Sequence, residues 1–189
     1  MTEVATLPST SLLIRRATPL DAAVLHELAA ATFPMASPPD TLREDIDAFI
    51  AAQLSEARFG DYLADPSRIL FLASLEGEAV GYTMLVTGEP YDEEAAQAVV
   101  HRPTVELSKI YVRSEQHRSG VAGELMAASV RAAIDTGARS VWLGVNQRNE
   151  RANRFYEKQG FRIVGTKHFH VGTRLFEDFV RELSLAAGS

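Results

Sequence analysis

A run of small residues between a strand-like and a helix-like segment is the first feature that could do chemistry. His117 to Ala122 reads His-Arg-Ser-Gly-Val-Ala, and the pattern of a long helix begins at Val121. Gly120 allows a backbone turn that other residues resist. The first N–H groups of a helix have no partner within the helix, and the helix dipole favours an anion there. The segment therefore fits a phosphate-binding loop, to which Arg118 could add charge, although many α/β proteins use such a loop only as a tight connection.

A second pattern of polar and aromatic residues follows in residues 141–161, which read VWLGVNQRNERANRFYEKQGF. Asn149 precedes a helix expected over 150–159, and Gly160 follows it, as N-cap and C-terminal residues do. Tyr156 lies on the apolar face of that helix, where a tyrosine can be a core residue. Asn149 can likewise serve as a helix cap, a ligand or both.

Together these two segments resemble the GNAT family of acyl-CoA-dependent N-acetyltransferases. The first is similar to that family's pyrophosphate-loop motif, Gln/Arg-x-x-Gly-x-Gly/Ala, with Gly120 and Ala122 in place but His117 where Gln or Arg is usual. The second is similar to the pattern Asn-x-x-Ala-x-x-x-Tyr-x-x-x-Gly-Phe at every fixed position, beginning at Asn149. The resemblance covers residues 105–162 and includes the spacing between the motifs.

The resemblance implies a binding site for acetyl-CoA as co-substrate. The pantetheine arm would pair with the backbone of one strand, the pyrophosphate would lie in the loop, and a backbone N–H near Ile110 would stabilise the oxyanion. The cofactor-binding residues expected on this basis are Ile110, Tyr111, Val112, His117, Arg118, Ser119, Gly120, Val121, Ala122 and Asn149. No metal site is expected, because His168 and His170 have no carboxylate or cysteine at ligand spacing.

Glu106 and Tyr156 are the candidate catalytic residues for proton transfer. The resemblance places Glu106 where several family members carry a catalytic glutamate, and Tyr156 near the thioester sulfur. A primary amine with a pKa of about 10.4 is neutral in only about one molecule in 2,500 at pH 7, so transfer needs a base or a water chain. Burial would make Glu106 a better base; otherwise it attracts a cationic acceptor or is an outward-facing strand carboxylate. Tyr156 would donate a hydrogen bond or a proton to the departing thiolate.

Composition excludes several other classes of protein. The chain has 189 residues, of which 46% are hydrophobic and 23% charged, and we expect a flexible segment at 1–10 and one domain over 11–185. The absence of cysteine excludes disulfides, thiolate metal sites and a cysteine nucleophile, and it agrees with direct acetyl transfer. The first 100 residues carry 5 Lys/Arg and 16 Asp/Glu, and the remainder carry 14 and 9. Because an acidic half repels nucleic acid, and no signal peptide or membrane span is evident, we expect a cytoplasmic protein without nucleic-acid or membrane partners.

Strands and helices alternate along the chain. Strands are expected over 11–16, 69–75, 79–86, 105–112, 140–145, 161–170 and 174–183, and helices over 18–33, 41–54, 59–64, 93–99, 121–136 and 150–159. Glu76-Gly77-Glu78 indicates a hairpin, and Pro34 marks the start of a loop. The strands at 105–112 and 140–145 form a parallel βαβ unit with the helix between them. The resemblance implies an α/β fold with a mixed, mostly antiparallel sheet of about seven strands. That sheet would be splayed between 105–112 and 140–145, with helices on both faces.

The sequence specifies the acceptor less well than the cofactor. The acidic segment Asp92–Glu94 would flank the acceptor site in this fold, and the tail from His168 to Asp178 is similar to that of polyamine N-acetyltransferases. We therefore expect a small cationic amine or polyamine as substrate, although Asp92–Glu94 could also be a solvated loop. Two alternatives stay open: acetylation of protein N-termini or lysines, and a non-catalytic acyl-CoA sensor. The closing strand pair could offer an edge for a homodimer.

Overall fold

Seven strands form one sheet in the computed structural model, which describes residues 11–172 and 174–185. The strand order is β1-β2-β3-β4-β5-β7-β6, and every neighbouring pair is antiparallel except β4 and β5. The strands are β1 (Leu12–Arg16), β2 (Arg68–Leu75), β3 (Glu78–Thr87), β4 (Thr104–Val112), β5 (Ser140–Asn146), β6 (Arg162–Val171) and β7 (Arg174–Ser184). The predicted mixed, mostly antiparallel sheet is confirmed. The segment 1–10, expected to be flexible, lies outside the described residues.

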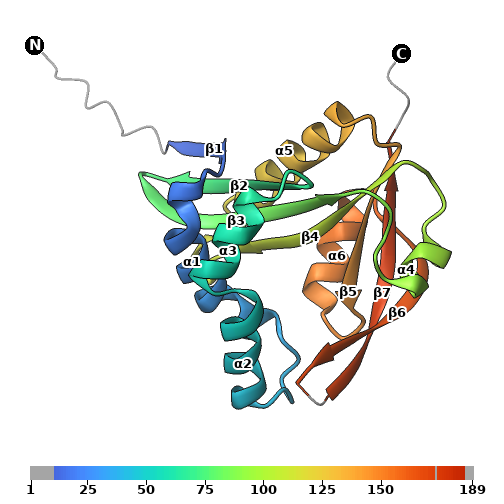
Figure 1. Cartoon of the computed structure of the whole chain (residues 1–189), viewed down its shortest axis with the longest axis horizontal. Coiled ribbons are helices and arrows are strands. Elements are labelled where there is room, and N and C mark those ends of the chain that lie inside the picture. The colour runs from blue at the N-terminus through green and yellow to red at the C-terminus, as the bar shows by residue number, and fades with distance from the viewer. Residues whose placement is uncertain (1–10, 173, 186–189) are drawn as a thin grey trace, which may run out of the picture.

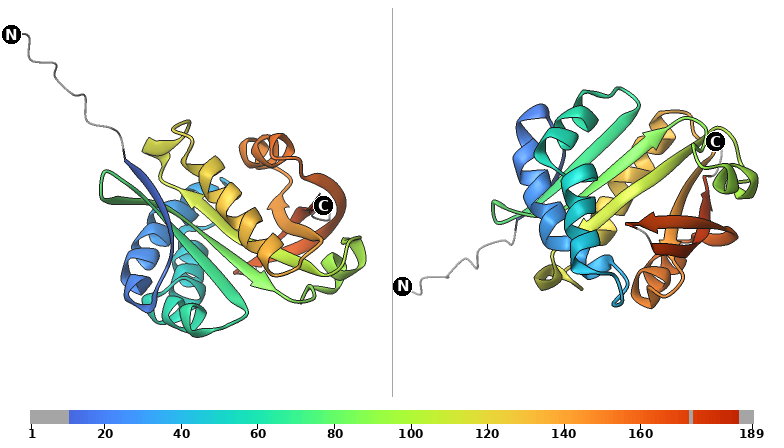
Figure 2. Two further views of the ribbon diagram at one scale, coloured as in Figure 1. Left: turned by 90° about the horizontal axis from the view of Figure 1, so that it is seen from above. Right: turned by 60° about the horizontal axis from the view of Figure 1, so that its bottom comes forward.

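Helices cover both faces of this sheet. They are α1 (Ala22–Ala36), α2 (Arg43–Gln53), α3 (Glu56–Ala64), α4 (Glu93–Ala98), α5 (Val121–Asp135) and α6 (Glu150–Lys158). One face, called the α1 face here, is covered by α1, α2 and α3, and the opposite α5 face is covered by α5 and α6 (Figures 1 and 2). Leu25, Phe59 and Tyr82 are fully buried beneath the α1 face, and Leu85 and Val141 lie in the core beneath the α5 face. Within the described ranges, no helix combines the length and apolar character needed to cross a bilayer.

The two central strands remain paired only at one end. Their parallel ladder runs from Thr104–Ser140 to Glu106–Trp142 and comprises no further pair. The hydroxyl groups of Thr104 and Ser140 lie 2.8 Å apart and hold the closed end together. Beyond this ladder β4 and β5 diverge, as Figure 1 shows, and the diverging segments are called the β4–β5 fork here. The predicted splay is thus confirmed.

Local sequence signals explain where several elements begin and end. Glu76 and Gly77 join β2 to β3 with φ values of 53° and 87°, the left-handed pair that a two-residue hairpin turn requires. The prediction that the first long helix ends at Phe33, before Pro34, is wrong, because α1 continues to Ala36. Proline removes only its own N–H from the helix, and the Ser37 N–H still reaches the Phe33 carbonyl oxygen at 3.1 Å.

Candidate active site

A curved loop leads into the first turn of α5. Arg118 and Gly120 have φ values of 79° and 87°, so two left-handed residues curve the chain just before the helix. The N–H groups of Val121, Ala122 and Gly123 occupy the first turn of α5, where no intrahelical acceptor exists. A Cβ added at Gly120 or Gly123 would meet nothing within 4 Å. A concave set of N–H groups at the start of a 15-residue helix suits an anion such as a pyrophosphate.

The side chains of the loop are turned back onto its own backbone. The His117 Nε2 atom lies 3.2 Å from the Val112 carbonyl oxygen, and the Ser119 hydroxyl donates to the Gln116 carbonyl at 2.6 Å. Burial, and then the charge of Arg151, lower the pKa of His117, so the first turn of α6 lies close to the loop. The histidine at position 117, where the family motif has Gln or Arg, therefore affects how the loop is held. The groups suited to bind an anion are still the backbone N–H groups.

One edge of β4 is free along the β4–β5 fork. The Arg113 N–H bonds the Val80 carbonyl at 2.8 Å, which fixes the alternation of this antiparallel pair. The backbone groups of Tyr111 consequently point toward β3, while those of Ile110 and Val112 point into the fork. Because His117 already contacts the Val112 carbonyl, the Val112 N–H and both groups of Ile110 are the ones left for an added, strand-like ligand.

Glu106 stands at the closed end of the fork, on the α1 face. Its neighbours Val105 and Leu107 belong to the core beneath the α5 face, so alternation sends the Glu106 side chain the other way. Burial raises the pKa of Glu106, against the opposing charges of Lys109 and Lys167. A carboxylate with a raised pKa is a stronger base than an exposed one.

Tyr156 lies on the α5 face, across the sheet from Glu106. Its ring centroid is 5.5 Å from that of Phe155 and 5.9 Å from that of Phe161. Burial raises the pKa of Tyr156 well above that of an ordinary tyrosine, so its hydroxyl stays protonated at neutral pH and can donate a hydrogen bond. Tyr111, on β4, is close enough to raise that pKa further. The two candidate catalytic side chains thus approach the fork from opposite faces.

The turn between β5 and α6 is braced by a buried polar network. Asn149 Oδ1 accepts the Ala152 N–H at 3.1 Å, so this residue caps α6 and keeps its amide N–H groups as donors. Asn153 Nδ2 donates to the carbonyl oxygens of Asn146 and Asn149, at 3.0 and 2.9 Å. Arg181 Nε in turn donates to Asn153 Oδ1 at 3.0 Å. Both members of this last pair are buried, which makes the turn that carries Asn149 rigid.

The acidic segment beside the α1 face is docked on β6. Asp92 caps α4 by accepting the Ala95 N–H at 2.8 Å, and its other oxygen lies 3.6 Å from Lys167 Nζ. Glu94 accepts the His168 backbone N–H at 2.7 Å and contacts the ring Nδ1 at 2.9 Å. The segment is therefore attached to β6 beside the α1 face and is not a loop free in solvent.

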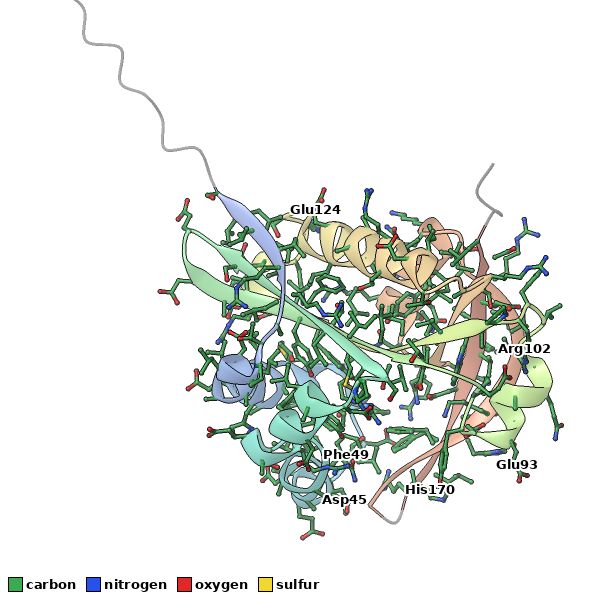
Figure 3. The ribbon with its side chains drawn as sticks, turned by 45° about the horizontal axis from the view of Figure 1, so that its top comes forward. Asp45, Phe49, Glu93, Arg102, Glu124 and His170 are labelled. Carbon is green, nitrogen blue, oxygen red and sulfur yellow. The ribbon has the colours of Figure 1, made fainter. Side chains whose placement is uncertain are left out.

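Helix α2 closes the opposite side of the α1 face against the β6–β7 hairpin. Phe49 stacks on Phe33 at 4.5 Å and meets Phe169 edge-on at 6.0 Å. Figure 3 shows Phe49 directed toward the hairpin strand that carries His170, with Glu93 on α4 beyond it. These contacts leave the fork bordered by α2 on one side and by α4 on the other.

The loop between α1 and α2 is tied to both the hairpin and the β5–α6 turn. Asp40 accepts hydrogen bonds from Arg148 at 2.9 Å and from Arg174 at 3.0 Å. A cavity of about 500 Å³ lies beside them, and Asn146 and Phe176 are among the residues that line it. The open end of the fork is thus next to a space large enough for a small molecule.

A family model described as the Acetyltransferase (GNAT) family matches residues 23–161. This chain belongs to that family. An uncharacterized N-acetyltransferase of Mycobacterium tuberculosis (strain ATCC 25618 / H37Rv) is 46% identical over 165 residues, or 86% of this chain and 98% of that protein. The PaiA N-acetyltransferase from Thermoplasma acidophilum, solved in complex with coenzyme A, has a TM-score of 0.74 at 18% identity, covering 93% of this chain and 99% of that one. NAA60 of Arabidopsis thaliana, in complex with a bisubstrate analogue, has a TM-score of 0.71 at 16% identity, covering 94% and 100%.

In this GNAT N-acetyltransferase, the prediction that Tyr111 pairs with the cofactor through its backbone is wrong, because its backbone groups bond β3, while the other predicted cofactor residues lie on three neighbouring segments. The loop before α5, the free edge of β4 and the braced Asn149 turn all border the β4–β5 fork, and Tyr156 faces it from the α5 side. Sequence reasoning missed the charged residues of the α1 face beside the fork. Lys109 lies with its ammonium 5.9 Å from the Tyr62 ring centre, and burial lowers its pKa to about 8. Lys167 and Asp178 are cross-strand partners, a pairing that only the register of β6 and β7 reveals.

Proposed function

We propose that this GNAT enzyme transfers an acetyl group from acetyl-CoA directly to a primary amine of a small cationic molecule. The observation that carries the proposal is the β4–β5 fork, with half-buried Glu106 on one face and half-buried Tyr156 on the other. A fork that opens to both faces lets donor and acceptor approach one point from opposite sides. No residue is needed as a covalent carrier, which agrees with a chain that has no cysteine.

The residues present fit acetyl-CoA. The curved loop from His117 to Ala122 and the free N–H groups of α5 suit its pyrophosphate, and the free edge of β4 suits the amides of its pantetheine arm. Asn149 keeps its amide donors for the same arm. When bound, acetyl-CoA supplies an activated acyl thioester. The PaiA structure, which contains coenzyme A, shares this fold.

Glu106 is the proposed proton acceptor for the incoming amine. Bringing an amine with a pKa of about 10.4 to its neutral form at pH 7 costs about 4.6 kcal/mol. Burial gives Glu106 a raised pKa, which reduces the mismatch between base and amine, and a water can relay the proton. The Ile110 N–H points into the fork and is the proposed donor to the developing oxyanion.

Tyr156 is the proposed hydrogen-bond donor to the departing thiolate. Its pKa is raised by burial, so full proton transfer to a thiolate, whose conjugate acid has a pKa of about 8.5, is uphill. The contribution is therefore stabilisation by a hydrogen bond from a neutral hydroxyl. Tyr156→Phe tests this role without removing the ring that packs against Phe161.

A thiol-release assay with acetyl-CoA against a panel of amines tests the proposal. The panel contains diamines and polyamines, amino acids, aminoglycosides and short peptides. Turnover of small cationic amines in preference to peptides is the expected result. Turnover of peptides alone would favour a protein acetyltransferase, and a blank panel with tight acetyl-CoA binding would favour a sensor. The cytoplasmic location and a homodimer stay predictions.

A further inference from the structure

Asp178 is a buried carboxylate that the proposed chemistry does not use. It lies on β7, where its Cα partners are Asn146 on β5 and Lys167 on β6. Its neighbour Phe179 packs in the core beneath the α5 face, so Asp178 projects to the α1 face, as Glu106 does. The side chain is only 7% exposed. Asp178 and Glu106 thus share one side of the sheet at the fork.

The Asp178 carboxylate has an oxygen without a partner. Its Oδ1 atom is buried and accepts no hydrogen bond within the described part of the chain. Its neighbour Lys167 is directed elsewhere, with Nζ 3.6 Å from Asp92. A buried carboxylate oxygen without a donor is unfavourable, and a cation that supplies N–H groups removes that penalty.

A glycine on β5 makes room for the groups that surround Asp178. A Cβ added at Gly144 would come within 3.4 Å of Asp178 Oδ2 and within 2.7 Å of Lys167 Cε. The carboxylate and the lysine stem therefore lie over the bare backbone of β5. A side chain at Gly144 would collide with the Lys167 stem.

The charged and titratable groups around Asp178 come from three elements. Lys167 on β6 favours its ionised form, Asp92 at the start of α4 disfavours it, and Tyr111 on β4 has its own pKa raised by Asp178. Burial is the largest influence and raises the pKa of Asp178 to about 6. Because Tyr111 stands on the other arm of the fork, Asp178 faces across the fork toward β4.

We propose that Asp178 binds a second cationic group of the acceptor, so that the enzyme prefers acceptors that carry an ammonium group in addition to the amine that loses its proton to Glu106 and is acetylated. This inference rests on the proposed function. On β5, Trp142 is the Cα partner of Glu106 and Asn146 is the Cα partner of Asp178. These two partners are four residues apart, or roughly 13 Å along a strand. Side chains that reach toward one another shorten that span, which suits the ends of a linear diamine.

The test compares linear diamines with monoamines of the same chain length. Diaminobutane, diaminohexane and diaminooctane are assayed beside butylamine, hexylamine and octylamine in the wild type, Asp178→Asn and Glu177→Gln. Glu177→Gln is the matched control because it removes the same charge at the adjacent, exposed position on the other face. We expect a wild-type preference for at least one diamine of about tenfold or more in KM, as for a hydrogen bond to a charged group. Asp178→Asn should lose the preference for the diamine over the monoamine, while its KM for acetyl-CoA stays unchanged. Glu177→Gln should retain the preference for the diamine.

A second readout does not depend on turnover. The side-chain carboxyl ¹³C resonance of Asp178 is followed in wild-type protein with coenzyme A while diaminohexane or hexylamine is added. A saturable shift with the diamine at lower concentration than with the monoamine is expected. If no amine in the panel is acetylated but the resonance shifts, the proposed function fails and the cation site stands. An unmoved resonance, or a diamine preference that survives Asp178→Asn, overturns the inference whatever the activity.

Discussion

Substitution of Asn153 by alanine should destabilise the protein through the turn that carries Asn149. The change removes two donor bonds, to the carbonyls of Asn146 and Asn149, and the side-chain acceptor of Arg181. Two neutral hydrogen bonds contribute about 2 kcal/mol together, and a buried guanidinium left without that acceptor adds about 1–3 kcal/mol. The expected loss in free energy of unfolding is therefore about 3–5 kcal/mol.

Thermal unfolding measures the loss of stability, and acetyl-CoA titration measures whether the turn that carries Asn149 still binds the cofactor. For a chain of this length a loss of about 3 kcal/mol lowers Tm by about 6–12 °C. Asn153→Asp separates the two parts of the network, because it retains an acceptor for Arg181 but places a carboxylate against two carbonyl oxygens. It should therefore weaken acetyl-CoA binding, since the turn is pushed out of place.

Arg154→Ala is the matched control for Asn153→Ala. Arg154 follows Asn153 on α6 and makes only an exposed contact with Glu150 at 3.3 Å among the described residues. Its loss should leave Tm and acetyl-CoA affinity nearly unchanged. If Asn153→Ala lowered Tm no more than this control does, the buried network would not brace the turn, and the reasoning from its hydrogen bonds would be refuted.

Three further outcomes follow from the site. Tyr156→Phe should lower kcat about tenfold, as expected for the loss of one hydrogen bond, while the Kd for acetyl-CoA stays the same, and an unchanged kcat would exclude the donor role. Glu106→Gln should remove the acidic limb of the pH dependence of kcat/KM and also raise stability at pH 7. The pKa of Glu106 is higher in the folded than in the unfolded protein, so the free energy of unfolding falls as pH rises from the unfolded-state pKa through the folded-state pKa. Urea titrations of both proteins at pH 4 and pH 7 would check this sign. Gly120→Ala should cost about 1–2 kcal/mol, because φ is 87° there, and should weaken acetyl-CoA binding measured by calorimetry.

The central elements could be predicted because their signals are local. The strand, loop and helix from Glu106 onward are marked by a change of hydrophobic period and by Gly120, and the second helix by Asn149 and Gly160. The splay was expected only through family resemblance, since nothing in the residues of β4 states where its pairing with β5 stops. The end of α1 beyond Pro34 is not predictable from the proline, because a proline near a helix end removes only its own N–H and the helix can continue past it.

The acceptor side could not be predicted because β-bulges change which face a residue occupies. Glu106 and Lys109 are three residues apart, and strict alternation would put them on opposite faces. A register shift at Ser108 in β4 brings them to the same face. A second shift, at Val164 in β6, sets the pairing of Lys167 with Asp178. One extra residue reverses every later side chain in a strand, and no local sequence signal announces it.

The uneven distribution of charge along the chain has a mechanical consequence. Four ion pairs and one Glu–His contact join an acidic residue of the first 100 positions to a basic residue of the remainder, and none described here joins them in the reverse sense. The five are Asp40–Arg148, Asp40–Arg174, Glu89–Arg102, Asp92–Lys167 and Glu94–His168. The two parts of the chain are thus drawn together around the border of the fork, where the backbone ladder supplies only its closed end. Most of these pairs face solvent, so added salt screens them. We therefore expect higher ionic strength to loosen the contacts that border the fork, while the apolar core beneath each face stays intact.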